Sequence, residues 1–182
     1  MNTNQQVESK VSVELLKKLS VVDLITLCEA AEATMLDTYG FRIGSKKWHP
    51  PMSRDLEEYF TGVMLIQERQ LIVGRIGKDI VGSLQLLFPH KLNKSSNFAV
   101  SMYDLFVLHA ARNSGVAEAM IKFAEKYSRM QKYTVMKLAV ESIRTEALSL
   151  FEKLGYKRWG VLDKFVVVGN EIISGHFYCK DL

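Results

Sequence analysis

The chain has few cysteines, few prolines and no long apolar run. Its two cysteines, Cys28 and Cys179, are far apart in the sequence and form no CxxC motif, so we expect neither a metal site nor a disulfide framework. No apolar stretch approaches the roughly 20 residues that a membrane helix needs, and the first residues lack the basic-then-apolar order of a secretory signal. These absences predict a soluble, cytoplasmic protein.

The composition fits one globular domain. Of the 182 residues, 48% are hydrophobic and 24% are charged, a balance that supports a single packed core. We expect a flexible N-terminal tail over residues 1–10 and a single domain over residues 11–182. The net charge of +4 comes from scattered Lys and Arg residues. We therefore expect no nucleic-acid or membrane partner, whereas a phosphate-bearing cofactor would explain a local basic patch.

Hydrophobic periodicity and turn residues predict the element order β-α-α-β-β-β-α-β-α-β-β. Ser20 is suited to cap the first helix, Gly77-Lys78 and Gly169-Asn170 are typical of hairpin turns, and the period changes from two to about 3.6 at Gly115. We expect strands over residues 11–19, 71–73, 80–88, 98–108, 135–140, 164–168 and 172–178. Three helices should begin near residues 20, 53 and 115, and a fourth should span residues 145–154. This order predicts an α/β (mixed α+β) fold with helices on both faces of a sheet.

The most informative segment runs from Leu105 to Ala117, where an apolar strand leads through a short loop into a helix. The start of a helix presents unpaired backbone N–H groups and the positive end of the helix dipole, so it suits an anion. Gly115 and Ala117 carry no side chain large enough to hold a phosphate away from those groups. Many folds have a strand followed by a glycine-started helix that binds nothing, so the local pattern alone fits both interpretations.

The run Arg112-x-x-Gly115-x-Ala117 resembles the acyl-CoA signature of the GNAT acetyltransferase superfamily. Downstream, residues 138–140 and 147–156 resemble that superfamily's next conserved strand and helix, at a matching spacing. The whole domain is also similar to bacterial small-molecule members of the tabtoxin-resistance type. The resemblance implies a central mixed, mostly antiparallel sheet with helices on both faces.

The resemblance further implies that acetyl-CoA is the cosubstrate and CoA the product. The pantetheine arm would lie along the strand, beside Leu105 and Val107, as an added strand does, and a backbone N–H near Phe106 or Val107 would polarise the thioester carbonyl. The pyrophosphate would rest on the backbone amides of residues 113–117. The expected cofactor-binding residues are Leu105, Phe106, Val107, Arg112, Asn113, Ser114, Gly115, Val116, Ala117, Phe151 and Lys153.

Three positions depart from the family pattern. Many members have a tyrosine where Phe151 stands, and its hydroxyl is thought to protonate the departing thiolate. Some have a glutamate near the position of Ser101 and an asparagine where Arg144 stands. A thiolate of pKa about 8.5 is a tolerable leaving group without an acid, but an amine of pKa about 10.4 must lose a proton before it attacks. Some base is therefore needed.

The sequence offers three candidate bases, Tyr103, Asp104 and Glu141. Each also has a plain structural explanation, as a half-buried strand aromatic, a turn carboxylate and a surface charge. The preferred hypothesis is an N-acetyltransferase that moves the acetyl group of acetyl-CoA to a primary amine of a small molecule by direct attack.

Two alternatives stay open at this point. The chain would be a non-catalytic acyl-CoA-binding or sensing module if the departures at Phe151 and Ser101 abolish turnover, or a peptide amine would be the acceptor. The resemblance implies an acceptor site between the first two helices, the loop around Trp48 and His49, and the final hairpin. A homodimer is compatible with it.

Overall fold

Seven strands form one sheet in the spatial order β1-β2-β3-β4-β5-β7-β6 in the computed structural model of the chain. It describes residues 11–38, 53–90, 92–95, 97–168 and 171–182. The strands are β1 (Val11–Leu15), β2 (Arg69–Ile76), β3 (Asp79–Leu87), β4 (Ala99–Val107), β5 (Val135–Glu141), β6 (Lys157–Val168) and β7 (Glu171–Asp181). The helices are α1 (Val21–Thr38), α2 (Ser53–Leu65), α3 (Val116–Met130) and α4 (Thr145–Lys153), with a 3-10 turn, η1 (His109–Ala111). The predicted order of elements is confirmed.

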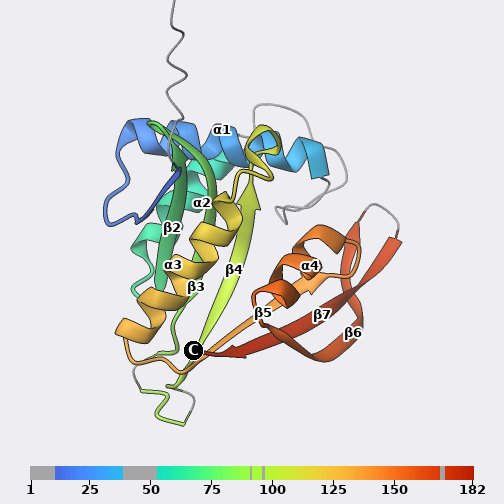
Figure 1. The fold of residues 1–182 in the computed structure, drawn as a ribbon. Helices are drawn as coiled ribbons and strands as arrows, with labels where there is room; N and C mark the ends of the chain where they lie inside the picture. Colours follow the sequence, from blue (N-terminus) through green and yellow to red (C-terminus); the bar gives the residue numbers. More distant parts are fainter. Residues whose placement is uncertain (1–10, 39–52, 91, 96, 169–170) are drawn as a thin grey trace, which may run out of the picture.

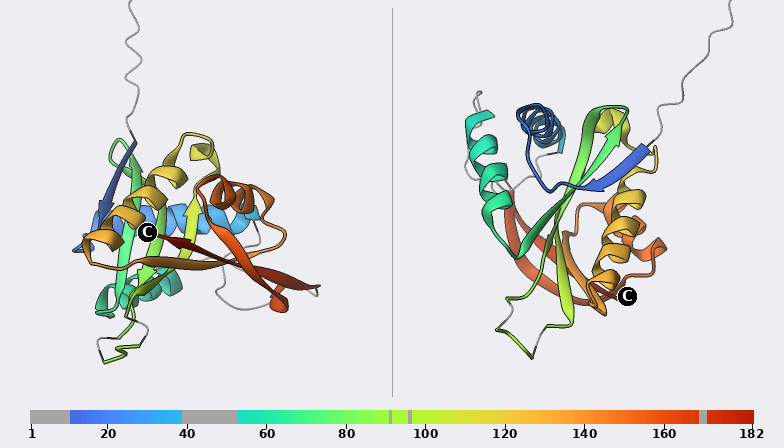
Figure 2. Two further views of the ribbon diagram at one scale, coloured as in Figure 1. Left: turned by 60° about the horizontal axis from the view of Figure 1, so that its bottom comes forward. Right: turned by 90° about the vertical axis from the view of Figure 1, so that its left-hand side faces the viewer.

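Helices cover both faces of the sheet, as predicted (Figure 2). On one face, α1 and α2 bury side chains such as Leu27 and Phe60 against the sheet. On the other face, α3 and α4 bury Met120 and Phe151 against the sheet. All neighbouring strands are antiparallel except β4 and β5, which are parallel. The predicted mixed, mostly antiparallel sheet is therefore confirmed.

The predicted strand limits need correction at several strands, most of all at β6. β1 ends at Leu15 rather than at residue 19, and β2 spans Arg69–Ile76 rather than residues 71–73. The sequence predicts a strand over residues 164–168, whereas β6 begins at Lys157. Its pairing with β7 shifts register between Arg158 and Gly160 and again between Leu162 and Val166. Each shift interrupts the alternation of inward and outward side chains, so residues 157–163 show no period-two pattern. The predicted tail over residues 1–10, the Trp48 and His49 loop and the Gly169-Asn170 turn lie outside the described residues.

The start of α1 confirms Ser20 as its N-cap. The Ser20 hydroxyl donates to Asp23 (2.7 Å), and the Asp23 backbone N–H donates back to the Ser20 hydroxyl (3.1 Å). The Arg75 guanidinium of β2 donates to Asp23 (2.6 Å) and to Glu14 of β1 (2.7 Å). Hydrogen bonds from Ser20 and Arg75 hold the pKa of Asp23 below its ordinary value of 3.8. One guanidinium thus joins α1 to the edge of the sheet.

This arrangement predicts a pH-dependent loss of stability in Asp23→Asn. A carboxyl with a lowered pKa in the folded state adds stability above its unfolded pKa, and that stability is lost as the pH falls through the folded pKa. We expect Asp23→Asn to lower the free energy of unfolding by about 1–2 kcal/mol at pH 7. Urea denaturation from pH 7 down to pH 2 should show the two curves converging below about pH 3.8. A pH-independent difference would contradict the role of the carboxylate.

Candidate active site

The sheet opens between β4 and β5. The two strands pair only over residues 99–101 of β4 and 135–137 of β5. Beyond Ser101 they diverge, which Figure 1 shows as a V between the two arrows. β5 therefore does not pair with the part of β4 beyond Ser101. A cavity of about 1110 Å³ fills the opening, lined by both strands, the start of α3, α4 and the β6–β7 hairpin.

A β-bulge lies in β4 where it borders the cavity. Ser83 of β3 faces Phe106 and Gln85 faces Tyr103, so β4 places two residues, Asp104 and Leu105, opposite the single Leu84. Asp104 has a φ of 50°, in the left-handed region that non-glycine residues rarely adopt. A bulge leaves its extra residue out of the ladder and turns the strand locally. The bulge therefore changes the direction of β4 where the strand borders the cavity.

The bulge also reverses which side chains of β4 face α3. Before it, Val100 and Met102 are buried in the core beneath α3. After it, Leu105 and Val107 pack against that same core, and Phe106 is buried on the α1 and α2 side. A one-residue insertion moves every later side chain to the opposite face, because side chains alternate along a strand.

The loop before α3 takes a conformation that needs glycine. Gly115 has a φ of 83°, and a Cβ placed there would meet no atom within 4 Å, so it would project into open space. The first helical bond of α3 runs from the Ala119 N–H to the Gly115 carbonyl (2.9 Å). The amides before Ala119 therefore have no partner within the helix. Together with the helix dipole they form a concave surface suited to an anion.

The Arg112 side chain links this loop to the end of β4 by a hydrogen bond. Its Nε donates to the Val107 carbonyl (3.4 Å), and its Nη1 lies 3.3 Å from His109 Nδ1. The Ser114 hydroxyl donates to the Ala111 carbonyl (2.5 Å). Ser114 does not line the cavity, because this bond holds its side chain against the loop. Ser114 can therefore contribute to the predicted cofactor site only through its main-chain N–H group.

The other predicted site residues all line the cavity between β4 and β5. Those expected to bind the cofactor line it, namely Leu105, Phe106, Val107, Arg112, Asn113, Gly115, Val116, Ala117, Phe151 and Lys153. The three candidate bases, Tyr103, Asp104 and Glu141, line it as well. Their assignment to cofactor or catalysis stays a prediction.

Phe151 lines the cavity but belongs mainly to the core. It is 3% exposed, and its ring stands edge-on to Tyr156 at 5.3 Å. The Tyr156 hydroxyl donates to the Met136 sulfur (3.1 Å), and burial raises the pKa of that phenol far above its usual range. Tyr156 does not line the cavity. This phenol is therefore not placed to replace the hydroxyl that Phe151 lacks.

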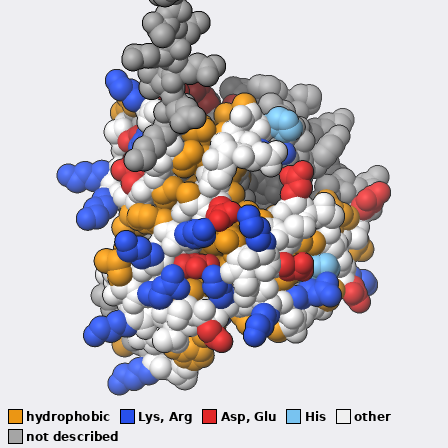
Figure 3. Space-filling model, in the orientation of Figure 1, with side chains coloured by type: hydrophobic (Ala, Val, Ile, Leu, Met, Phe, Trp, Pro, Cys, Tyr) orange, Lys and Arg blue, Asp and Glu red, His pale blue; other side chains and the backbone are white. Residues whose placement is uncertain are grey.

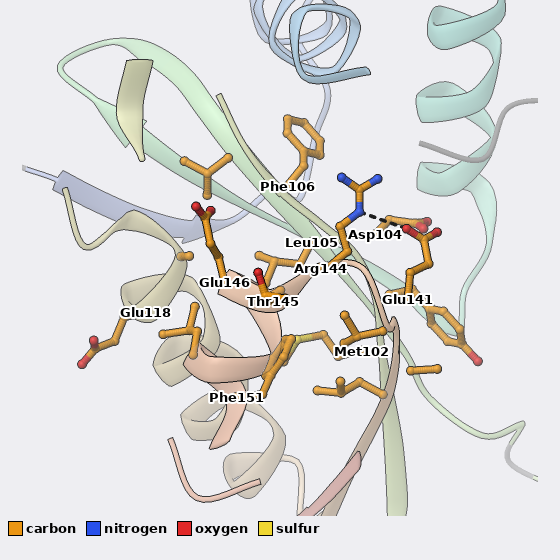
Figure 4. Close-up of a pocket in the computed structure, with 18 of the residues that line it drawn as sticks. Met102, Asp104, Leu105, Phe106, Glu118, Glu141, Arg144, Thr145, Glu146 and Phe151 are labelled. Atoms are coloured by element: carbon orange, nitrogen blue, oxygen red, sulfur yellow. Dashed lines mark hydrogen bonds and ion pairs between the residues drawn. The ribbon is translucent and has the colours of Figure 1, made fainter. Parts of the chain in front are cut away.

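The two carboxylates have different partners. Glu141 forms an ion pair with Arg144 (3.0 Å), the dashed contact of Figure 4. Asp104 instead accepts a hydrogen bond from the Tyr59 hydroxyl of α2 (2.6 Å). Tyr103 is 45% exposed. At the other end of the cavity, Lys153 pairs with Glu118 (3.3 Å). Among the described residues, the Asp104 carboxylate is therefore held by a neutral hydroxyl, whereas Glu141 is held by a guanidinium.

Several residues of the site were not predicted from the sequence. Tyr59 supports Asp104 from 45 residues earlier in the chain, and Gln85 lies 26 residues after Tyr59, to which it donates. In the sequence, the sign that could have pointed to these residues is the polar Gln85 within the apolar run of β3. Three aromatic side chains of the hairpin also line the cavity, Trp159, Phe165 and Phe177.

The described residues show neither a membrane-spanning helix nor a metal cluster. None of their helices is long and apolar enough to cross a bilayer, and they contain no group of three or more His, Cys, Asp or Glu side chains arranged to hold a metal. On the face in Figure 3, Lys and Arg side chains are spread over much of the surface, with Asp and Glu side chains among them. The positive net charge is therefore not gathered into one patch on that face.

Comparison with known proteins places the chain in a family. The model of the Acetyltransferase (GNAT) family matches residues 29–156. An uncharacterized N-acetyltransferase of Azospirillum brasilense is 34% identical over 131 residues, which cover 71% of this chain and 75% of the relative. Streptothricin acetyltransferase of Escherichia coli is 27% identical over 86 residues, which cover 47% of this chain and 46% of that enzyme.

A solved structure shares the fold. An acetyltransferase candidate from Salmonella typhimurium, solved with its cofactor acetyl-CoA, superimposes with a TM-score of 0.72 at 12% identity, over 94% of this chain and 93% of that one. At this identity the likeness concerns the fold alone. The family match and the Azospirillum relative cover most of the chain. The chain therefore belongs to the GNAT acetyltransferase family.

Proposed function

We propose that the protein acetylates a primary amine of a small molecule by direct attack on acetyl-CoA. The observation that carries this proposal is the cavity between β4 and β5, which joins the part of β4 that β5 does not pair with, a bulge and the start of α3. Streptothricin acetyltransferase, a relative, is named for a small-molecule acceptor. The proposal includes residues 11–182 as a single domain and a cytoplasmic location.

The residues of the cavity fit acetyl-CoA at two places. The part of β4 around Leu105 and Val107, with which β5 does not pair, would pair with the amides of the pantetheine arm, as a sheet edge accepts an added strand. The amides of residues 113–117 would hold the pyrophosphate, and the open space at Gly115 leaves room for close approach. The bulge would aim a main-chain N–H near Phe106 at the thioester oxygen.

Of the three candidate bases, the geometry favours Asp104. Glu141 is already engaged by the Arg144 guanidinium, whereas Asp104 accepts its hydrogen bond from the neutral Tyr59 hydroxyl. Asp104 would take one proton from the acceptor's ammonium group. The amine nitrogen then forms a bond to the acetyl carbon, the carbon–sulfur bond breaks, and its electron pair leaves on sulfur. The second amine proton goes to that sulfur through water, so the overall reaction releases one proton.

A panel of amines tests this proposal. The protein is incubated with acetyl-CoA and small-molecule amines, including aminoglycoside-like, amino-acid and polyamine acceptors, while thiol release is followed. Peptides with free N-termini serve as the competing class. We expect amine-dependent thiol release from at least one small molecule. Turnover of peptides only, or binding of acetyl-CoA without any turnover, would contradict the proposal.

The substitution Phe151→Tyr tests the alternative of a non-catalytic acyl-CoA module. If the enzyme works without a phenol at this position, the leaving thiolate needs no acid, since its pKa of about 8.5 makes it a tolerable leaving group. We expect Phe151→Tyr to change kcat by less than about threefold, well under the 10²–10⁴-fold worth of an essential acid. Steady-state kinetics with a responsive amine measures this. Turnover that appears only in the variant would support the non-catalytic alternative.

A further inference from the structure

A row of hydrogen bonds crosses the sheet and ends at Asp104. The Arg69 guanidinium of β2 donates to Gln85 Oε1 (2.7 Å), Gln85 Nε2 donates to the Tyr59 hydroxyl (2.9 Å), and that hydroxyl donates to Asp104 Oδ2 (2.6 Å). We call these four residues the Asp104 network. They come from β2, β3, α2 and the bulge of β4, and Gln85 is only 1% exposed.

The chemistry of the groups sets a single direction for this network. A guanidinium can only donate, so the Gln85 amide must turn its oxygen to Arg69 and its NH₂ to Tyr59. The phenol oxygen of Tyr59 then accepts that bond, and its one proton is left for Asp104. Every bond therefore points toward Asp104, which acts as the final acceptor.

The position of Asp104 distinguishes this network from a purely structural one. A network that served only to satisfy the buried Gln85 could end at Tyr59, because a phenol accepts and donates. Here it continues to an exposed carboxylate that lines the cavity, on a residue held at a φ of 50°. Backbone in that region persists where surrounding contacts hold it, and it gathers at functional sites.

We infer that Tyr59 is a positioning residue, which fixes the Asp104 carboxylate beside the thioester so that it can take the proton of the acceptor amine. This inference rests on the proposed function. Gln85 and Arg69 hold Tyr59 in turn. Other charged groups line the same cavity, from β5, α4 and its N-cap, and from the loop before α3 and its first turn, namely Lys137, Glu141, Arg144, Glu146, Lys153, Arg112 and Glu118.

Kinetics of Tyr59→Phe test the role in turnover, with Tyr178→Phe as the matched control. Tyr178 is fully buried and donates to the carboxylate of Glu152 (2.8 Å), but it does not line the cavity. Both variants lose one phenol–carboxylate bond. We expect Tyr59→Phe to lower kcat for the amine about tenfold, with KM for acetyl-CoA within twofold of the wild type, because a misplaced base slows the reaction. Tyr178→Phe should keep wild-type kcat.

A double-mutant cycle separates positioning from general damage. In the Asp104→Asn background, Tyr59→Phe should change kcat less than about twofold, because the group it positions is already gone. Equal losses from Tyr59→Phe and Tyr178→Phe, or the same tenfold loss in the Asp104→Asn background, would overturn the inference.

A titration of tyrosinate absorbance reads the Tyr59–Asp104 contact without any turnover. Burial and the bond to Asp104 raise the pKa of Tyr59 to about 12. Asp104→Asn removes the negative charge, so we expect more tyrosinate near pH 11 than in the wild type, and the excess should vanish in the double variant with Tyr59→Phe. No excess would overturn the inference. Lack of turnover by the wild type, with the excess present, would count against the proposed function instead.

Discussion

Replacing Asp104 by asparagine should lower kcat for the amine by about 100-fold or more at pH 7, within the range of a positioned base. Asparagine has nearly the same shape and still accepts the Tyr59 hydrogen bond, so the bulge should persist. The remaining rate should rise with pH, because more of the acceptor is then the free amine, with a pKa of about 10.4. The difference from the wild type should therefore shrink toward high pH. The pH dependence of kcat measures both effects.

Glu141→Gln is the comparison that decides between the two carboxylates. Glu141 is 11% exposed in its side chain and paired with Arg144, so its loss should lower stability. We expect a change in kcat of less than about fivefold, well below the effect of a lost base. Wild-type kcat in Asp104→Asn, or a larger loss in Glu141→Gln than in Asp104→Asn, would contradict the assignment of the base.

Gly115→Ala should weaken acetyl-CoA binding by about tenfold or more. An added Cβ would project into the open space before α3, where the pyrophosphate is proposed to lie. A non-glycine residue with a φ of 83° also costs roughly 1–2 kcal/mol in stability. A ligand that binds the folded state raises its apparent stability, so thermal shift with acetyl-CoA reports the loss.

The structure offers a matched control in Gly77→Ala. Gly77 has a φ of 65°, and a Cβ added there would likewise meet no atom within 4 Å, but Gly77 lies in the β2–β3 turn away from the cavity. Both substitutions should lower the melting temperature of the free protein to a similar degree. Only Gly115→Ala should reduce the stabilisation by acetyl-CoA. Equal stabilisation of the two variants would contradict the proposed pyrophosphate site.

Local signals in the sequence were enough for much of the fold and for the helix start. Gly115 marks the turn before α3 because glycine readily takes a positive φ, and Ala117 marks the open first turn of α3 because its side chain is small. Both signals are properties of single residues and can be read from the sequence. Ser20 and Gly77 likewise mark a cap and a turn that the structure confirms. Most of the predicted cofactor residues line the cavity because they follow one another along β4, the loop after it and the start of α3, whereas Phe151 and Lys153 reach it from α4.

The catalytic end of the site depends on contacts that no local pattern contains. The bulge at Asp104 is defined by the partner strand β3, so it appears only when Leu84 is seen opposite two residues of β4. Tyr59 reaches Asp104 because α2 packs on that face of the sheet, 45 residues earlier in the chain. The early start of β6 was missed for a related reason, since its two register shifts remove the alternating pattern.

The most direct test of this account is a crystal structure of the protein with acetyl-CoA. We expect the pantetheine arm between β4 and β5, hydrogen-bonded to the main chain near Leu105 and Val107, and the pyrophosphate against the amides before Ala119. The thioester should lie beside Asp104, with the carboxylate still bound to Tyr59. A coenzyme bound elsewhere, with the opening between the two strands closed by protein side chains, would contradict the account.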